Sequence, residues 1–268
     1  MSICLATGLY LLQKQCIRIL SYIFCIFLAA LLFDSTLSLH AGEKELPFHP
    51  GEKIKYSVRW EKVKAGKASF RVLDLTTING EKAYNFILEI ESNKYIDLFY
   101  KIRDKHEGFA NFDFNRSLLY RKKQKGKDKR DVKVLFNWDK KTALYSKSGR
   151  KIDPIKIPAN TFDPISAFYK MRTLKFNTGQ DLSFSVTNGK KYFIQKATVI
   201  KKETITISSG TYNTYQLALA VNHFSGVFKK SEHPTVKLWV TADNRKIPVR
   251  IKVKVFIGSV IFNLDSIT

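Results

Sequence analysis

Apolar and polar residues alternate along several stretches of this chain, and this period of two constrains the fold more than any other feature. In residues 53–60, 132–138, 182–186 and 247–255, nearly every second residue is apolar. Successive side chains of a β-strand point to opposite faces of a sheet, so this pattern places one face on a core and the other in water. Turn signals separate such runs at Asn79-Gly80, Lys125-Gly126, Asn188-Gly189 and Ser209-Gly210. The sequence therefore predicts antiparallel β-structure.

One segment departs from the alternation and predicts a short helix between two groups of strands. Asp163 is a favourable N-cap, and Pro164 suits the first helical position. The residues that follow at helical spacing are Ile165, Phe168, Tyr169 and Arg172. A second aromatic segment, residues 95–102, is compatible with either a strand or a short helix.

The chain also resembles itself. Residues 51–58 are similar to residues 179–186, and Gly80, before one expected strand, corresponds to Gly210 before another. The shared order and offset predict two similar meanders, about 51–150 and 176–268, joined by a helical connector, 151–175. The expected fold is mainly β: an antiparallel, strongly curved sheet or incomplete barrel, built from two similar meanders with one short helix between them.

The first residues have the layout of an export signal. Lys14 and Arg18 precede fifteen uncharged residues, 19–33, and this run is shorter than the roughly 20 residues that span a bilayer. We expect residues 1–41 to be an export signal, cut after Ala41 or after Ser38, and residues 42–268 to form a single β-rich domain. The alternative is an inner-membrane anchor through residues 19–33.

Cysteine usage agrees with export. Cys4, Cys16 and Cys25 are the three cysteines of the chain, so the mature part contains no thiol that could pair wrongly in an oxidising periplasm. We therefore expect the protein in the periplasm of a bacterial envelope.

The mature chain is strongly basic. Without Lys14, Arg18 and Asp34 it keeps 44 basic and 22 acidic residues, a formal charge of +22. Such an excess favours polyanions or anionic membranes, and after export a lipid or anionic glycolipid is a better partner than nucleic acid. The densest cluster is a hairpin tip with Arg121, Lys122, Lys123, Lys125, Lys127, Lys129 and Arg130. This tip is expected to contact anionic headgroups, or else to be a solvated tip whose lysines protect a strand edge.

Catalytic and metal-binding patterns are weak. The five histidines are His40, His49, His106, His223 and His233, and no HExxH, CxxC or G-x-S-x-G pattern occurs. Ser148 and Lys151 form an S-x-x-K pattern, but they lie in a polar turn. Enzymes that use this pattern for nucleophilic catalysis have it at the start of a helix. We expect no metal, no cofactor and no catalytic residue.

Aromatic residues are abundant, with 20 Phe, 12 Tyr and 3 Trp, and many occupy the inward positions of expected strands. They predict either a packed core or an apolar cavity plugged by the helix. For a cavity, the expected lining residues are Trp60, Phe168, Tyr169 and Trp239.

Three motifs together resemble the Domain of Unknown Function 3108 family of exported bacterial proteins. They are residues 51–60 with Ala65-Gly66-Lys67-Ala68, residues 163–169 with Arg172, and residues 238–240 with Asp243, Arg245, Ile247, Pro248 and Val249. The resemblance covers about residues 51–264 and implies an exported, β-rich protein. The family supplies no catalytic residue.

These observations lead to one main functional hypothesis and two alternatives. The main hypothesis is a non-enzymatic binder of an apolar or amphipathic envelope molecule, a lipid or glycolipid. The alternatives are a structural or adaptor protein that binds another envelope protein, and an envelope hydrolase.

Overall fold

The computed structural model describes residues 45–126, 129–220, 235–255 and 258–268. Residues Leu46–Thr268 form one compact unit. The expected export signal, the alternative anchor at 19–33, His40, Lys127, His223 and His233 lie outside the described residues. Among the described residues, no helix has the length and apolar character needed to cross a bilayer.

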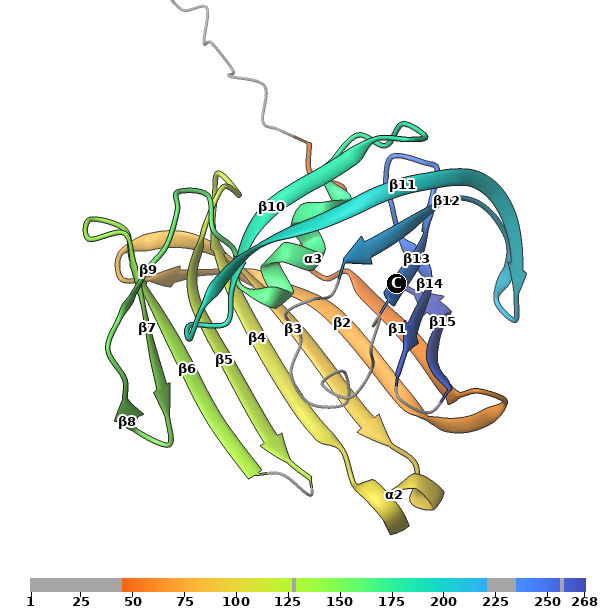
Figure 1. The fold of residues 1–268 in the computed structure, drawn as a ribbon, viewed down its shortest axis with the longest axis horizontal. Helices are drawn as coiled ribbons and strands as arrows, with labels where there is room; N and C mark the ends of the chain where they lie inside the picture. Colours follow the sequence, from red (N-terminus) through yellow and green to blue (C-terminus); the bar gives the residue numbers. More distant parts are fainter. Residues whose placement is uncertain (1–44, 127–128, 221–234, 256–257) are drawn as a thin grey trace, which may run out of the picture. The chain divides into compact units, whose positions relative to one another are not determined.

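The described residues form fifteen strands and two helices (Figure 1). The strands of the first half are β1 (Lys53–Trp60), β2 (Val63–Ile78), β3 (Glu81–Ser92), β4 (Arg103–Asn111), β5 (Ser117–Lys125), β6 (Lys129–Asn137), β7 (Thr142–Lys147), β8 (Arg150–Lys151) and β9 (Ile155–Lys156). Those of the second half are β10 (Asp181–Thr187), β11 (Tyr192–Ile207), β12 (Gly210–Ala220), β13 (Thr235–Thr241), β14 (Pro248–Lys254) and β15 (Ser259–Ile267). The helices are α2 (Lys94–Tyr100) and α3 (Pro164–Arg172).

All the strands belong to one antiparallel sheet. Its order is β10-β11-β12-β13-β14-β15-β1-β2-β3-β4-β5-β6-β7-β8, and β9 pairs with β7. The two halves join where β15 pairs with β1, and Lys53 and Thr268 exchange backbone hydrogen bonds of 2.8 and 3.0 Å there. The end strands β10 and β8 do not pair with each other, so the sheet is not closed into a barrel. The predicted mainly β fold is confirmed.

The sheet curls until its β10 end lies against the other half. A Cβ on Gly189, in the β10–β11 turn, would meet Val134 of β6 at 2.7 Å, and the Lys190 ammonium lies 4.8 Å from the ring centre of Tyr145 in β7. Helix α3 lies inside this curve and contacts β3, β4 and β10 (Figure 1). We call the face of the sheet that packs on α3 the inner face and the opposite one the outer face.

The two predicted meanders correspond strand by strand, β1–β6 with β10–β15. Their entry turns share a detail. Gly51 N donates to Val72 O at 2.9 Å, and at the equivalent place Gly179 N donates to Val199 O at 2.8 Å. The repeat detected in the sequence is therefore a repeat of backbone geometry.

Helix α3 begins as the sequence predicted. The Oδ1 atom of Asp163 accepts hydrogen bonds from the backbone N–H groups of Ile165 and Ser166, at 2.8 and 3.0 Å, and Pro164 occupies the first turn. The other aromatic segment forms helix α2, with Asn93 as its N-cap. Of the two expected structures, a strand or a short helix, the helix is therefore the one observed.

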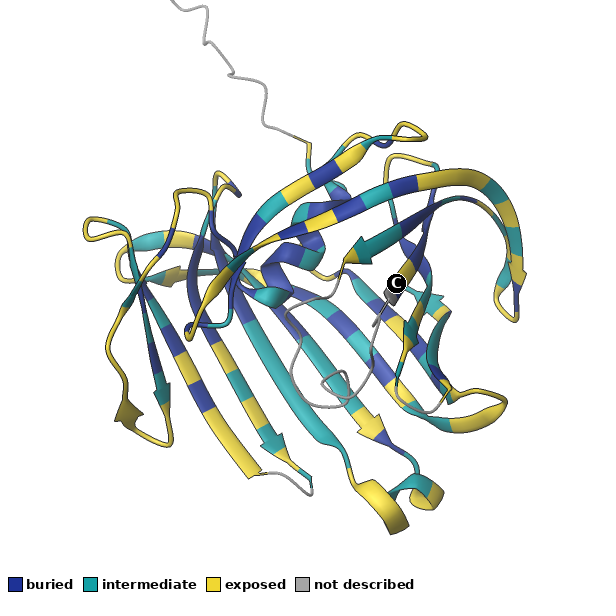
Figure 2. Cartoon of the chain, in the orientation of Figure 1, coloured by how far each residue is buried: buried dark blue, intermediate teal, exposed yellow. Residues whose placement is uncertain are grey.

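Aromatic side chains fill the space between α3 and the sheet. Phe168 stacks on Phe70 and Tyr169 stacks on Phe86, each with ring centres 4.1 Å apart, and Phe48 meets Tyr169 edge-on at 5.1 Å. Figure 2 shows that residues around α3 are buried and that burial decreases towards the strand ends next to α2. At the helix, the interior is a packed core.

Candidate functional site

The inner face continues beyond α3 towards α2, and there it changes character. We call this part the distal inner face. Most of its apolar members are only partly buried, unlike the aromatic core beneath α3, although Val58 of β1 is buried. The partly buried ones are Leu88, Ile90, Ile251, Val253, Val260 and Phe262. Its polar members are Asp104, His106 and Lys122, also partly buried.

Strand register places the apolar members side by side. Ile251 of β14 pairs with Phe262 of β15, which in turn pairs with Val58 of β1. The next row towards α2 joins Val253, Val260 and Trp60 in the same way. Residues that are directly opposite on adjacent strands share a face, so these rows form a continuous apolar strip across three strands.

The polar members lie on β4 and β5. His106 pairs in register with Leu88 on one side and Lys122 on the other, so it lies between an apolar and a basic side chain. A hydrogen bond of 2.8 Å joins His106 Nδ1 to the hydroxyl of the buried Tyr120. Burial, with a smaller contribution from the charge of Lys122, lowers the pKa of His106 to about 3, so its imidazole is neutral at ordinary pH.

Lys122 carries a charge that is partly withdrawn from water. Burial lowers its pKa, Asp104 opposes this effect and the charge of Arg130 adds to it. A partly desolvated ammonium gains from an anionic partner more than an exposed one does. The distal inner face thus combines an apolar strip with one ammonium group. Such a surface is complementary to an amphipathic molecule with an acidic headgroup.

The structure does not bring the four expected lining residues together. Phe168 and Tyr169 belong to the filled core at α3, and Trp60 lies 42% exposed at the end of β1. Trp239 alternates with Leu238 and Val240, which pack in one cluster with Met171 of α3, so Trp239 points to the outer face. There its Nε1 donates to Glu203 Oε1 at 2.9 Å.

The basic hairpin is β5–β6, and its charges are divided between two faces. Lys122 belongs to the distal inner face, whereas Arg121, Lys123 and Lys125 are exposed on the other face of β5. Arg121 and Lys123 line a polar outer hollow of about 340 Å³ together with Lys105, Glu107, Asp131 and Lys133. Lys129 and Arg130 are exposed at the start of β6.

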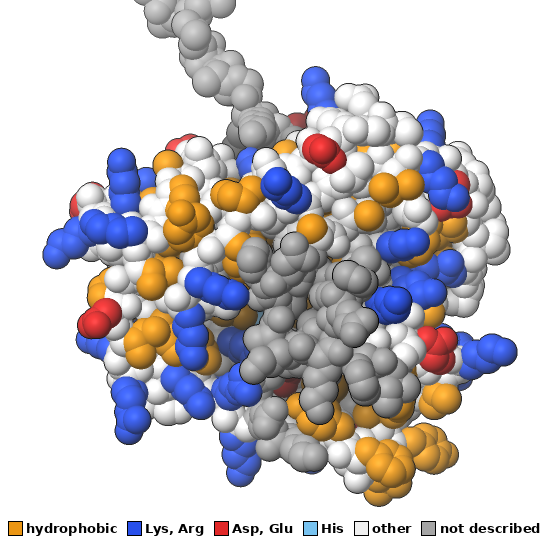
Figure 3. All heavy atoms as spheres, in the orientation of Figure 1, with side chains coloured by type: hydrophobic (Ala, Val, Ile, Leu, Met, Phe, Trp, Pro, Cys, Tyr) orange, Lys and Arg blue, Asp and Glu red, His pale blue; other side chains and the backbone are white. Residues whose placement is uncertain are grey.

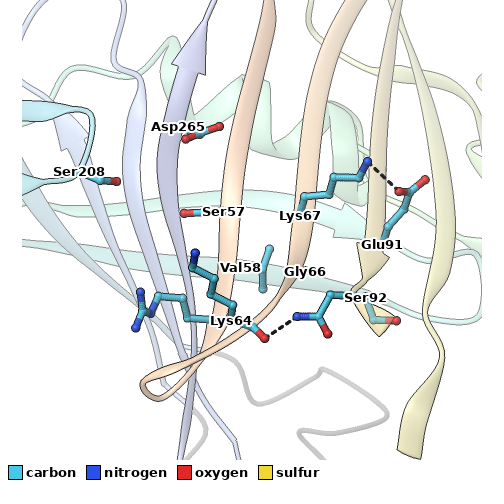
Figure 4. Close-up of a pocket in the computed structure, with 11 residues that line it drawn as sticks. Ser57, Val58, Lys64, Gly66, Lys67, Glu91, Ser92, Ser208 and Asp265 are labelled. Carbon is cyan, nitrogen blue, oxygen red and sulfur yellow. Dashed lines mark hydrogen bonds and ion pairs between the residues drawn. The ribbon is translucent and has the colours of Figure 1, made fainter. Parts of the chain in front are cut away.

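A larger hollow of about 550 Å³ lies where β1, β2 and β3 meet the β11–β12 turn (Figure 4). Most of the residues that line it are of polar types: Ser57, Arg59, Lys64, Lys67, Glu91, Ser92, Asn93, Ser208 and Asp265, with Val58 and Gly66. Lys67 Nζ lies 3.2 Å from Glu91 Oε2, and Asn93 Nδ2 donates to the carbonyl of Lys64 at 2.6 Å. Both contacts join groups within the lining itself.

Sequence reasoning did not single out His106 and Asp104, and it grouped Lys122 with the exposed tip. The alternation of residues 121–125 contained the missing signal, since Lys122 and Gln124 have the opposite parity to Arg121, Lys123 and Lys125. In the part of the chain that the structure describes, no group of three or more His, Cys, Asp or Glu side chains is placed to hold a metal ion.

Comparison with known proteins identifies a family and a fold. The family model described as "Protein of unknown function (DUF3108)" matches residues 55–265, as the sequence motifs predicted. A β-barrel-like protein of the family DUF1849 from Brucella abortus is similar in structure, with 9% identity and a TM-score of 0.50 over 81% of this chain and 96% of that one. At this identity the likeness concerns the fold alone.

A more distant structural match is a protein from Bacteroides fragilis whose description gives it as a candidate exported protein with a YmcC-like fold. It has 12% identity and a TM-score of 0.34 over 83% of this chain and 98% of that one. No curated protein matches the chain.

Proposed function

The chain belongs to the DUF3108 family, whose function is unknown, and we propose that it acts as an exported, non-enzymatic binder of an amphipathic envelope molecule. The binding surface is the distal inner face. An acyl or similar apolar chain lies along the strip formed by β14, β15 and β1, and an acidic headgroup lies near Lys122 of β5.

The observation that carries this proposal is the change in burial along one face of a single sheet. Under α3 the inner-face residues Phe70 and Phe86 are buried beneath stacked rings, whereas Leu88 and Phe262 further along are only partly covered. Burying a partly exposed apolar side chain stabilises a complex by about 25 cal/mol for each Å² removed from water. A ligand on this face therefore completes the burial that α3 begins.

Export of the protein is part of this proposal. It is supported by the layout of residues 14–33, with Lys14 and Arg18 before the apolar run, and by the absence of cysteine from the sequence after Cys25. An envelope location would give the inner face access to lipids and glycolipids.

The test is to purify the full chain without strong detergent, extract bound molecules and identify them by mass spectrometry. We expect an acidic amphiphile at a fixed ratio to the protein. Lys122→Gln should reduce the retained amount several-fold, because it removes the ammonium group from the inner face. Lys123→Gln is the matched control, since Lys123 is the next residue on the same strand but points outwards.

Two results would contradict the proposal. One is a protein that carries no amphiphile after gentle purification and takes none up from mixed micelles. The other is equal retention by the Lys122→Gln and Lys123→Gln variants, which would assign binding to general surface charge. Specific capture of another envelope protein by a chain without bound amphiphile would favour the adaptor hypothesis.

A further inference from the structure

Helix α2 carries an exposed apolar face that the fold does not use. Tyr95, Leu98 and Phe99 are 76%, 79% and 79% exposed, and no residue of this helix is buried. Their spacing of three and four residues puts them on one side of the helix. Figure 3 shows these hydrophobic side chains gathered at the position that α2 occupies in Figure 1.

The helix is held by polar contacts rather than by packing. The side chain of its N-cap, Asn93, accepts from Ile96 N at 3.0 Å and donates to Lys64 O at 2.6 Å. Arg103 Nη2 donates to Asp97 Oδ2 at 2.6 Å, and Ser92 Oγ bonds to the same carboxylate. A seven-residue helix is marginal in water by itself, so this network fixes a helix that has no fully buried side chain.

Other parts of the chain reach the same end of the sheet. We call this end the rim; it consists of α2, the β1–β2 turn and the described ends of the β5–β6 and β14–β15 hairpins. Val63, 57% exposed, and Trp60 add apolar surface at the β1–β2 turn. A Cβ on Gly126 would lie 2.0 Å from the carbonyl oxygen of Lys101, which places the end of β5 directly beside α2.

The rim is basic around its apolar centre. The exposed basic residues on it include Lys62, Lys64, Lys94, Lys101, Lys125, Lys129 and Lys254. Its carboxylates are fewer: Asp97 is paired with Arg103, and Glu61 lies against Gly258 in the β14–β15 turn. Apolar and aromatic side chains surrounded by lysines match the interface of an anionic bilayer, where the rings enter the headgroup region and the ammonium groups meet phosphates.

We propose that the rim is a membrane-docking surface, which inserts Tyr95, Leu98 and Phe99 of α2 into the interface of an anionic lipid bilayer. The rim also adjoins the last apolar row of the distal inner face, through Trp60 and Val260. Docking goes beyond the proposed binding function and does not require it, because an empty inner face leaves the rim unchanged.

The experiment measures flotation of the full chain with vesicles of phosphatidylcholine alone or with about one third phosphatidylglycerol. The test variant is Tyr95→Ser with Leu98→Ser and Phe99→Ser. We expect it to bind anionic vesicles at least about tenfold more weakly than the unmodified chain, because three side chains no longer enter the interface. The matched control is Tyr192→Ser with Ile194→Ser and Ile200→Ser, which removes three exposed apolar side chains from β11 and should leave the affinity unchanged.

Charge is tested separately with Lys94→Glu and Lys101→Glu, against Lys140→Glu and Lys175→Glu elsewhere on the surface. Only the first pair should weaken binding to anionic vesicles several-fold. Residues 1–44 are the same in all variants, so differences among them report on the rim.

A position-specific readout comes from Phe99→Trp. The difference spectrum against the unmodified chain should shift to shorter wavelength when anionic vesicles are added, as the new indole leaves water. Equal affinity of the α2 and β11 variants, or a difference spectrum of Phe99→Trp that does not shift, would overturn the proposal and leave the exposed helix as a surface for a protein partner.

Discussion

Arg172 and Glu52, 120 residues apart in the sequence, form a two-point ion pair inside the protein. Arg172 Nη1 donates to Glu52 Oε1 at 2.6 Å and Nη2 donates to Oε2 at 2.8 Å, with side chains 0% and 6% exposed. The guanidinium also donates to the carbonyls of Pro47 and Arg245. One side chain at the end of α3 therefore ties together the start of β1, the segment before it and the β13–β14 turn.

Breaking this pair should be costly. Arg172→Met leaves the Glu52 carboxylate buried without its partner, and we expect the free energy of unfolding to fall by about 3 to 5 kcal/mol. Urea denaturation measures this change. The double variant Arg172→Met with Glu52→Gln should lose less than the sum of the single variants, because neither buried charge then remains unpaired.

The exposed pair Lys67–Glu91 is the control for that experiment. Its side chains are 77% and 47% exposed. Lys67→Met should change stability by no more than about 1 kcal/mol, as is usual for surface pairs. Similar losses for Lys67→Met and Arg172→Met would show that the Arg172 pair is not a structural clamp.

His106 should make stability depend on pH. The folded protein keeps this imidazole neutral down to about pH 3, whereas the unfolded chain takes up a proton below about 6.5. Between these values the unfolded state binds more protons, so stability falls as the pH falls through this window. At about pH 5 the loss amounts to about 2 kcal/mol.

The His106→Gln variant keeps a hydrogen-bonding group near Tyr120 and removes this titration. Its urea midpoint should therefore vary less between about pH 7 and pH 5 than that of the unmodified protein. An unchanged pH dependence in His106→Gln would show that other groups control it.

Gly108 should tolerate no side chain. A Cβ there would lie 2.6 Å from Asp163 Oδ1, and this carboxylate cannot move freely because Ser117 and Ser166 also donate to it. We expect Gly108→Ala to destabilise the protein by about 2 kcal/mol through displacement of the α3 cap. Thermal unfolding checks the prediction, and an unaltered midpoint would contradict it.

Arg103 should control the order of α2 without controlling the whole fold. Its hydrogen bonds hold the pKa of Asp97 below the ordinary range and connect the helix to β4. Arg103→Gln should speed hydrogen exchange at the amides of α2 and change the urea midpoint little. Arg121→Gln, which affects a longer contact of 3.8 Å to Glu107, should not alter exchange in α2.

The sequence predicted the parts of the fold that depend on local chemistry. Alternation in residues 53–60 and 182–186 identified strands, and Asp163-Pro164 identified the start of α3, because both signals act between near neighbours. The repeat predicted that two meanders exist. The pairing of β15 with β1 could not be predicted, because alternation shows which side of a strand is apolar but not which strand lies beside it.

The candidate site was less predictable for the same reason. Arg172 was recognised as a helical position, but its partner Glu52 lies far away in the first meander and carries no sequence signal of burial. Trp239 was expected to line a cavity beside α3, yet its position in the alternation of β13 places its side chain on the outer face. Burial of polar groups such as His106 depends on the curl of the sheet, which no local pattern encodes.

The hydrogen bonds between Lys53 and Thr268 have a consequence for the order of assembly. Strand β1 belongs to the first meander, which is synthesised early. One of its edges nevertheless stays unpaired until β15, near the end of the chain, has been synthesised. Contacts that span so much chain form slowly, and an open strand edge attracts foreign strands in the meantime. A nascent molecule therefore stays vulnerable until residues 259–267 arrive, and a chaperone that shields β1 would be most useful in that interval.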